Sequence, residues 1–559
     1  MHVVLFSAPE GPTLQSIEDD GRASGDPRAV DATRLAGEVA VLEADHPRWV
    51  WDDTSKWYPP LLAAGVRIER CVDLRLSHVI LRNSALTVAS ALARSAPSSW
   101  DRATPEAIER RDQHALFDLD EPEEPAVAED TLAEFALQRE AIAESADPAR
   151  VGLLLAAESA GALVAAEIRF AGLPWSAEVH DKTLTAYLGP RPPDGQRPEL
   201  LDAVLARLRH ALDAPHLNPD SPTDLLKALG VAGLMVKSTR SWELKKLTHP
   251  AIEPLLEYKK LARLLAANGW NWLDTNVRDG RFHPDYVPGG VVTGRWASKG
   301  GGGALQLPKQ IRGAVIADPD WKFVVADAAQ LEPRILAAMS GDRGMAEAGS
   351  AGDLYAGIVA SGAVETRDQA KVAMLGAMYG ATTGESGRLM PALTRAYPRA
   401  IGLVEEAARA GEKGEIVTTR LGRSSPRPGA QWREIQADAY GETATDADAS
   451  RARGQARGWG RFTRNFVVQG SAAEWALCWM AGLRGRLHEI GGGRWITGSP
   501  HLVFFMHDEV VVHCPAELAA EVEAAVRSAA ADAGTLMFGA MPVTFPLTVV
   551  VVDNYGQAK

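Results

Sequence analysis

Two aspartates, Asp327 and Asp508, each lie in an apolar stretch of the sequence. Asp327 ends the run 321–327 and Asp508 lies within 503–512, and both runs are rich in Val and Phe, which favours strands. A turn or a buried salt bridge would explain either acid by itself. Taken together, two carboxylates from distant strands could hold Mg²⁺ against phosphate groups.

A segment between the two aspartates carries Arg367, Lys371, Leu375 and Tyr379 at intervals of four residues. This spacing places the four side chains on one face of a helix. Two cations one turn apart, followed by an apolar side chain and a tyrosine, would suit a polyphosphate with a sugar or base beyond it. An ordinary exposed helix face is the alternative for this segment taken alone.

A second helical segment concentrates positive charge, with five arginines in residues 451–464 and no acid until Glu474. The arginines that share one helix face are Arg457, Arg461 and Arg464. In a chain of net charge −13, such a local cluster indicates contact with a phosphate backbone. Asn465 and Gln469 follow one turn apart and can offer amides to base edges or sugars.

Glu332 lies five residues after Asp327, in the sequence Asp-Ala-Ala-Gln-Leu-Glu-Pro-Arg. It could be a second metal ligand, a surface residue, or a steric wall beside a bound sugar. The spacing in the sequence does not distinguish these roles.

The composition of the 559 residues allows several domains, with 46% hydrophobic residues and only three cysteines. No stretch reaches the roughly 18 apolar residues of a membrane span, and residues 1–7 lack the regions of a signal peptide. Three cysteines are too few for a disulfide framework or a zinc site. We therefore expect a cytoplasmic protein without a membrane partner, and an acidic total charge is compatible with a nucleic-acid enzyme that has basic surfaces such as 225–268.

The elements that must position these residues follow from hydrophobic periodicity and turn residues. Residues 1–95 predict a small α/β unit, and the acidic stretch 118–125 predicts a linker or surface loop. The further expected helices are 131–170, 200–212, one starting at Ser221-Pro222, a long helical stretch 329–410, 470–489 and 516–533. The further expected strands are 281–292, the run ending at Asp327, a hairpin around Asp508 and 547–552.

Together, these motifs resemble those of the family A DNA polymerases, in the order that the family has them. Residues 327–334 resemble motif A, 367–380 resemble the O-helix motif B, and His507-Asp508-Glu509 resembles motif C. Further matching stretches are Thr293-Gly294-Arg295, Leu305-Gln306, Ile311-Arg312 and Asn465 to Gly470. A single His-Asp-Glu would be a weak signal, whereas the ordered set is specific.

The resemblance implies an α+β multidomain fold. Residues 1–145 would form an RNase H-like α/β domain of the 3′–5′ exonuclease type, and residues 146–559 a right-hand polymerase domain. Its expected parts are a thumb at about 150–290, a palm at about 291–340 and 415–559, and fingers at about 341–414. From the length of the chain we expect no 5′-nuclease domain of the kind that full-length polymerase I has.

The resemblance also implies an activity, namely DNA-templated addition of dNTPs to a primer 3′-hydroxyl by two-metal nucleotidyl transfer, with release of pyrophosphate. Two Mg²⁺ ions, replaceable by Mn²⁺, would be held by Asp327, Asp508 and Glu509. Arg367 and Lys371 would act in catalysis on the triphosphate. The other nucleotide contacts would be Leu375, Tyr379, Gln330 and Glu332, with Glu332 as the gate against a 2′-hydroxyl.

Primer-template DNA and dNTPs would be the partners of a monomer that works in the cytoplasm at the nucleoid. The DNA contacts implied by the resemblance are Arg295, Gln306, Arg312, Arg461, Asn465, Gln469 and His507. The lysine-rich region 225–268 would lie in the thumb and grip the duplex backbone.

Two departures from the family pattern concern the nucleotide pocket and the loop before motif A. Leu375 stands where the family usually has an aromatic ring, so we expect weaker nucleotide binding. A glycine run at 300–303 replaces a serine-rich loop.

A third departure concerns the front of the chain. Its first strand lacks the Asp-x-Glu that exonuclease metals require, and the nearby acids are Asp52, Asp53 and Asp73. We therefore expect an exonuclease-like fold that has lost its proofreading metals. A polymerase that still proofreads, and a catalytically inactive DNA-binding module, are the alternatives.

Overall fold

The computed structural model describes residues 1–101, 130–193, 195–298, 307–350, 352–381, 384–439, 441 and 444–558. Gln306, the glycine run 300–303 and the acidic stretch 118–125 lie outside the described residues. The chain divides into two compact units. The first comprises Met1–Ala171, Asp285–Ala297 and Ala326–Val550, and the second comprises Gly172–Pro284, Ser298–Val325 and Val551–Lys559. This partition differs from the predicted exonuclease-like, thumb, palm and fingers domains, whose boundaries stay predictions.

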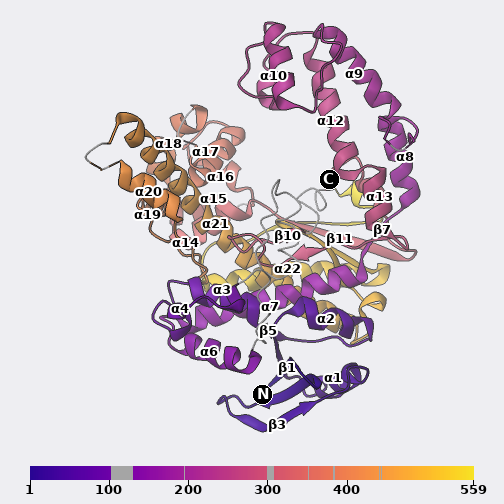
Figure 1. The fold of residues 1–559 in the computed structure, drawn as a ribbon, viewed down its shortest axis with the longest axis vertical. Coiled ribbons are helices and arrows are strands. Elements are labelled where there is room, and N and C mark those ends of the chain that lie inside the picture. Colours follow the sequence, from indigo (N-terminus) through magenta and orange to yellow (C-terminus); the bar gives the residue numbers. More distant parts are fainter. Residues whose placement is uncertain are drawn as a thin grey trace. The chain divides into compact units, whose positions relative to one another are not determined.

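The first unit begins with a five-stranded sheet of order β3-β2-β1-β4-β5, coloured indigo near the N-terminus (Figure 1). Its strands are β1 (His2–Ala8), β2 (Gly11–Ile17), β3 (Ala23–Ala29), β4 (Arg48–Trp51) and β5 (Cys71–Asp73). β1, β2 and β3 are antiparallel, whereas β1, β4 and β5 are parallel. Side chains alternate between two cores, because Val3 and Leu5 pack into one cluster and Val4 into another. We refer to this five-stranded sheet as the front sheet.

Helices cover the front sheet, as the pattern of residues 1–95 and 131–170 predicts. They are α1 (Leu35–Glu43), α2 (Thr54–Ala63), α3 (Leu74–Asn83), α4 (Ala91–Arg94), α6 (Thr131–Ala143) and α7 (Pro148–Ala171). Among the described residues, α7 is the one helix long and apolar enough to cross a membrane, contrary to the expectation that no stretch is. The buried share of its most apolar window is 72%, as in a core helix, and α7 packs against α2, α3 and β5.

A second sheet, the central sheet, has the order β12-β13-β11-β14. Its strands are β11 (Trp321–Ala328), β12 (His501–Met506), β13 (Glu509–Pro515) and β14 (Leu547–Val552). β12 and β13 form the predicted hairpin, with Met506 paired to Glu509 and a two-residue turn between them. The final strand has the predicted bounds.

Two helices of the first unit pack against the hairpin of the central sheet, α21 against β12 and α22 against β13. The predicted helix 470–489 is the second half of a 45-residue helix, α21 (Asp446–Ile490), which a capping box at Thr445 starts. The predicted helix 516–533 is a short 3₁₀ turn followed by α22 (Ala519–Phe538). α21 and α22 pack against each other.

In its described part, the stretch 329–410 is helical as expected, but the helical segments there number six. They are α14 (Leu331–Ser340), α15 (Arg343–Ser350), α16 (Leu354–Ala360), α17 (Arg367–Tyr379), α18 (Gly384–Ala396) and α19 (Pro398–Glu412). Helix termini coincide with residues that interrupt helices, because α14 ends at Gly341 in the left-handed region and α19 begins with Pro398. A seventh helix, α20 (Ala430–Asp438), lies before α21.

The second unit is mainly helical. Its helices are α8 (Ala177–Leu188), α9 (Glu199–Ala211), α10 (Pro222–Val231), α11 (Ser241–Leu244), α12 (Ile252–Asn268) and α13 (Trp270–Asn276). α10 starts as predicted, since the Ser221 hydroxyl accepts a hydrogen bond from the Asp224 amide and Pro222 is the first helical residue. A small sheet of order β6-β8-β7 joins β6 (Leu173–Pro174), β7 (Val277–Arg278) and β8 (Arg281–Phe282).

The predicted strand 281–292 is wrong as one element. It contains only the two-residue strands β8 and β9 (Tyr286–Val287), and β9 pairs with β10 (Ala297–Ser298). Pro284 lies between the two short strands and Pro288 follows the second. Proline cannot donate to a sheet, so it ends each pairing.

Candidate active site

The central sheet brings Asp327 and Asp508 together. Asp327 is the next-to-last residue of β11, and Asp508 lies in the turn between β12 and β13, the strand beside β11. The Ala328 amide donates to the backbone oxygen of Asp508 over 2.9 Å. Both aspartates are partly exposed. Two acids far apart in the sequence thus lie side by side at the same end of the neighbouring strands β11 and β13.

This pair of carboxylates fits the way proteins hold Mg²⁺, which is often bound by one or two carboxylates with substrate phosphates completing the shell. Among the described residues, no group of three or more His, Cys, Asp and Glu side chains is placed to hold a metal. Glu509, the first residue of β13, is 1% exposed. Its role as a third ligand stays a prediction.

Glu332, in the first turn of α14, is fixed from two sides. One carboxylate oxygen accepts a hydrogen bond from Arg295 at 2.5 Å, and the other accepts from the Tyr379 hydroxyl at 2.7 Å. Gln469 of α21 in turn donates to the Tyr379 oxygen over 3.3 Å. Since side chains of the protein engage both oxygens, the arrangement favours a rigid wall over a metal ligand.

The surroundings of Glu332 also set the protonation of its neighbours. Burial, and then the charge of Glu332, raise the pKa of Tyr379 above its ordinary value, so the phenol stays a hydrogen-bond donor. The pKa of His507 lies below its ordinary value, because partial desolvation of the imidazole and then the charge of the Arg295 guanidinium oppose its protonation. The hairpin turn gives His507 a left-handed backbone, with φ +61°.

The predicted cationic face is present on α17, which starts with a capping box between Thr366 and Gln369. Arg367 and Lys371 are exposed, and Leu375 is partly buried. The predicted four-residue spacing is therefore helical throughout, and both cations are accessible to an anion.

Asp353 and Tyr355 are site residues that sequence reasoning missed. Asp353 caps α16 by accepting from the amides of Tyr355 and Ala356, and it binds the Arg367 guanidinium at 2.8 Å. The guanidinium carbon of Arg367 also lies 5.6 Å from the centre of the Tyr355 ring. An aspartate just before a helix is a cap signal in the sequence, but its second partner on α17 is a tertiary contact.

Gln330 connects Asp353 to the motif around Asp327. Gln330 has a left-handed backbone, φ +53°, at the N-cap of α14, and its amide nitrogen donates to Asp353 over 3.1 Å. Its oxygen accepts from the Leu354 amide at 3.0 Å. The predicted nucleotide contact therefore has a positioning role in the structure, joining α14 to α16.

The predicted arginine face of α21 is divided in the structure. Arg457 and Arg461 are exposed, and the stem of Arg461 packs so closely on Gly380 that a Cβ there would lie 2.7 Å from its Cγ. The expectation that Arg464 shares this surface is wrong, because Arg464 is buried and donates to the Ala377 carbonyl at 2.8 Å and to Glu405 at 2.7 Å. Glu405 lies on α19, so sequence proximity did not reveal this counter-ion.

The two amides of α21 are both partly buried. Gln469 meets Tyr379, as described above, and Asn465 lies one turn earlier on the same helix. Their contact with DNA stays a prediction.

Arg312 belongs to the second unit and has structural partners there. It is 8% exposed, its Nε donates to the Leu307 carbonyl over 3.0 Å, and its guanidinium lies 4.7 Å from the centre of the Tyr555 ring. Its DNA contact stays a prediction, and Gln306 lies outside the described residues.

The front-sheet acids have partners that account for them. Asp53 caps α2 through the Ser55 amide, and Asp73 caps α3 through the Leu76 amide and also accepts from the Thr54 amide. Burial, and then the charge of Asp53, raise the pKa of Asp73 to about 7. Asp52 accepts from the Trp57 indole and from Lys56.

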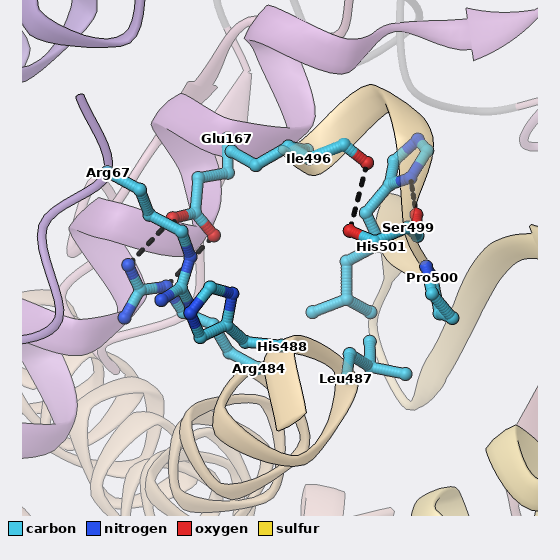
Figure 2. Close-up of a pocket in the computed structure, with 10 residues that line it drawn as sticks. Arg67, Glu167, Arg484, Leu487, His488, Ile496, Ser499, Pro500 and His501 are labelled. Atoms are coloured by element: carbon cyan, nitrogen blue, oxygen red, sulfur yellow. Dashed lines mark hydrogen bonds and ion pairs between the residues drawn. The ribbon is translucent and has the colours of Figure 1, made fainter. Parts of the chain in front are cut away.

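A buried ionic network lies in the first unit around a small cavity (Figure 2). Arg484 of α21 donates to both oxygens of Glu167 of α7, at 2.9 and 2.6 Å, and the Tyr58 hydroxyl of α2 donates to the same carboxylate at 2.6 Å. Arg67 lies 3.4 Å from Glu167. The network thereby joins the helices that cover the front sheet to α21, the helix that carries Asn465 and Gln469.

Comparison with known proteins agrees with this geometry. The chain is 26% identical to a thermostable DNA polymerase I of Thermus filiformis over 349 residues, which cover 56% of this chain and 37% of the relative. It is 27% identical to DNA polymerase I of Chloroflexus aurantiacus over 333 residues, 54% of this chain and 32% of the relative. It is 28% identical to DNA polymerase I of Mycobacterium tuberculosis over 347 residues, 56% of this chain and 34% of the relative. The chain thus spans about a third of the length of these curated relatives.

A solved structure has a similar fold over the whole chain. It is the POL domain of Pol1 from M. smegmatis, in complex with DNA primer-template and dNTP, and the TM-score is 0.69 at 18% identity, covering 100% of this chain and 95% of that one. The model of DNA polymerase family A matches residues 204–556, more than half of the chain. This protein belongs to DNA polymerase family A.

Proposed function

We propose that this protein is a DNA-templated DNA polymerase that joins dNTPs to a primer 3′-hydroxyl and releases pyrophosphate. The observation that carries the proposal is the adjacency of Asp327 and Asp508 in the central sheet. The curated relatives are named DNA polymerase I, and the solved domain with the similar fold holds primer-template and dNTP. The similarity to these proteins supports DNA and dNTPs as partners of this chain.

Two divalent ions bound at Asp327 and Asp508 would supply activation of the 3′-hydroxyl and neutralisation of the developing phosphate charge. The aspartates would fix where those charges lie, because the sheet and the hairpin turn hold both backbones rigidly. Glu509 would support the site from β13.

Arg367 and Lys371 would bind the triphosphate from the exposed face of α17. Arg367 pairs with Asp353 at 2.8 Å, so binding of a triphosphate would exchange one anionic partner for another. Arg367 is 53% exposed, so solvent weakens the pair and the exchange costs little. Leu375, one turn after Lys371, would meet the nucleotide with less contact area than a ring gives.

Glu332 and Tyr379 would form the wall beside the sugar. Because Arg295 and Tyr379 hold both oxygens of Glu332, the carboxylate could not move aside for a 2′-hydroxyl without breaking a charged hydrogen bond. The same network would present Gln469 and Arg295 to the growing end of the primer.

The remaining DNA contacts would come from exposed basic surfaces. Arg461 and His507 are exposed in the first unit. In the second unit, the segment 225–268 exposes Trp242, whose ring lies 5.0 Å from the Lys246 ammonium. We propose this segment as the tip of a thumb, with palm and fingers at the predicted ranges.

The front of the chain would serve as a scaffold. The strand order β3-β2-β1-β4-β5 supports an RNase H-like, exonuclease-type fold, and the use of Asp53 and Asp73 as helix caps supports the loss of proofreading. We further propose a monomer that acts on DNA in the cytoplasm.

Primer extension tests the polymerase proposal. Wild type with Mg²⁺ and four dNTPs should extend a labelled primer, whereas Asp327→Asn and Asp508→Asn should not, and the exposed front-strand variant Asp26→Asn should extend normally. Retained DNA binding by the inactive variants would show that catalysis alone was lost. Absence of extension by a folded wild type would favour the inactive binding module.

Proofreading is tested separately, by incubating 3′-labelled single strands with metal and no nucleotides. We expect no shortening. Shortening that persists in Asp508→Asn and disappears in a variant of the front-sheet acids would show an active exonuclease.

A further inference from the structure

A second cavity in the first unit, of about 250 Å³, opens where the parallel strands of the front sheet begin. His2 of β1 is the register partner of Arg48 of β4, and Cys71 of β5 pairs with Trp49. Helices α6 and α7 close the cavity. The cavity is lined by His2, Arg48, Cys71, Val72, Phe135, Gln138, Arg139, Ile142, Gly152, Leu155, Ala156 and Ser159.

The polar side of this lining is cationic and contains no carboxylate. Within the described part of the chain, Arg48 forms no ion pair, and burial followed by the charge of Arg70 lowers its pKa. Arg139 donates to the backbone carbonyls of Glu18 and Asp19, and the carboxylate that its charge influences, Asp19, is exposed and lies outside the lining. Two guanidinium groups therefore share a partly buried site without a buried anion, which is unfavourable unless an anion binds.

The acids nearest to this lining already have other partners. Asp19 is 82% exposed; it binds the amino group of Met1 at 2.8 Å and lies 3.9 Å from Nδ1 of His2. Glu69 binds His46 at 2.6 Å, and its charge also favours the protonated form of Arg48. In the network of Figure 2, by contrast, Glu167 lies between two arginines. The two cavities thus have similar cations, but only the cavity at the start of the strands lacks a carboxylate in its wall.

The opposite side of the cavity is apolar. Phe135 is buried, with its ring centre 5.3 Å from that of His2, and Val72, Ile142, Leu155 and Ala156 extend the surface. Gln138 and Ser159 are buried polar groups whose donors are already used, by Leu74, Glu134 and Leu155. A ligand with one anionic end and one flat apolar end matches this division.

We propose that this cavity binds a small phosphomonoester, its phosphate held by Arg48, Arg139 and His2 and its apolar group packed against Phe135 and Leu155. A phosphomonoester carries about −1.5 to −2 charges near neutral pH, which matches the charge of two guanidinium groups. A ligand with a single carboxylate would leave one of these positive charges unmatched. The volume lies just below the range of about 300–1,000 Å³ for ordinary ligand sites, so a mononucleotide is near the upper limit of size. The site uses none of the residues of the candidate active site.

Calorimetric titration of the full chain with AMP, inorganic phosphate and adenosine tests the proposal. A background of Arg367→Gln and Lys371→Gln removes the nucleotide site proposed on α17. We expect one AMP per chain, weaker binding of phosphate, and no binding of adenosine. Equal affinities for AMP and phosphate would show that no apolar group packs against Phe135 and Leu155. Absence of AMP binding at millimolar concentration would overturn the whole proposal.

Substitutions of the two lining arginines test whether AMP binds in this cavity. Arg48→Gln and Arg139→Gln should each raise the Kd for AMP about 10- to 100-fold, because each removes a charged hydrogen bond. Arg34→Gln, at an exposed arginine outside the cavity, should leave the Kd unchanged. An unchanged Kd in both cavity variants would place AMP elsewhere.

Two further measurements do not depend on removing an arginine. A Cβ at Gly152 would meet no atom within 4 Å, so Gly152→Leu should fill the cavity, abolish AMP binding and keep the fold. Burial, then Arg139, the terminal amine and Arg48 lower the pKa of His2 to about 4 against the opposing charge of Asp19, and a bound phosphate should raise it. Histidine resonances followed by NMR should therefore show a higher His2 pKa with AMP, and an unchanged pKa would exclude the phosphate from this position.

Discussion

The front sheet and the central sheet both place aspartates at strand ends, but they use them differently. In the front sheet, Asp73 is 2% exposed and a helix begins at the next residue, so its carboxylate caps that helix. In the central sheet, Asp327 is partly exposed and the next helix starts four residues later, with Gln330 as its N-cap. The backbone that follows each strand therefore differs: it uses the Asp73 carboxylate as its helix cap, whereas after Asp327 the N-cap position is taken by Gln330.

The largest expected effect separates the aspartates of the central sheet from those of the front sheet. Asp327→Asn or Asp508→Asn should lower the primer-extension rate on the order of a thousandfold, because each removes several kcal/mol of charge stabilisation. Asp73→Asn should change that rate by no more than about twofold, since asparagine still caps a helix. The three rates are compared by single-turnover extension. A large loss of activity in folded Asp73→Asn would end the distinction between the sheets.

The next prediction concerns the pH dependence of stability. The pKa of Asp73 is about 7 in the folded protein and near 3.8 when exposed, so the folded state holds its proton between these values. Stability contributed by Asp73 is thus full below about pH 4 and lost as the pH rises through about 7. Glu474, with a pKa raised by burial to about 7, acts in the same direction.

In wild type, the thermal unfolding midpoint should therefore fall as the pH rises from weakly acidic to neutral. In Asp73→Asn this fall should be smaller by several degrees. The exposed variant Asp26→Asn serves as the control and should keep the wild-type slope. An unchanged slope in Asp73→Asn would mean that the carboxylate is ionised in the fold, like an ordinary exposed cap.

A smaller effect is expected at Glu332, which distinguishes a wall from a metal ligand in the central site. Glu332→Ala should lower the discrimination between dNTPs and rNTPs about 10- to 100-fold, because it opens space for the 2′-hydroxyl. Glu332→Gln keeps the size of the side chain and should retain most of the discrimination. Loss of all activity in both variants would instead assign Glu332 to the metal.

The smallest effect is expected at Leu375. Leu375→Phe should lower the KM for dNTP by about fivefold or more, since stacking on a ring is worth roughly 1–3 kcal/mol. Val372→Phe places a ring on another face of the same helix and should leave the KM unchanged. Steady-state kinetics that show no decrease in Leu375→Phe would remove leucine as the cause of weak nucleotide binding.

Local sequence was sufficient for the elements that carry the site. The four-residue spacing from Arg367 to Tyr379 predicted α17, because helical periodicity is a property of the segment itself. The hairpin around Asp508 and the strand ending near Asp327 follow from their Val and Phe content. The strand expected at 281–292 failed for an equally local reason, the prolines within it.

The sequence by itself determined the motifs, their order and the helical or extended state of each. Only the tertiary structure decided which charged groups were already satisfied. Arg464 is paired with Glu405, Arg367 with Asp353, and Glu332 with Arg295, and none of these pairs is close in sequence. Electrostatic pairing depends on distance in space, and the packing of helices on a sheet fixes that distance, so spacing along the chain could not reveal these partners.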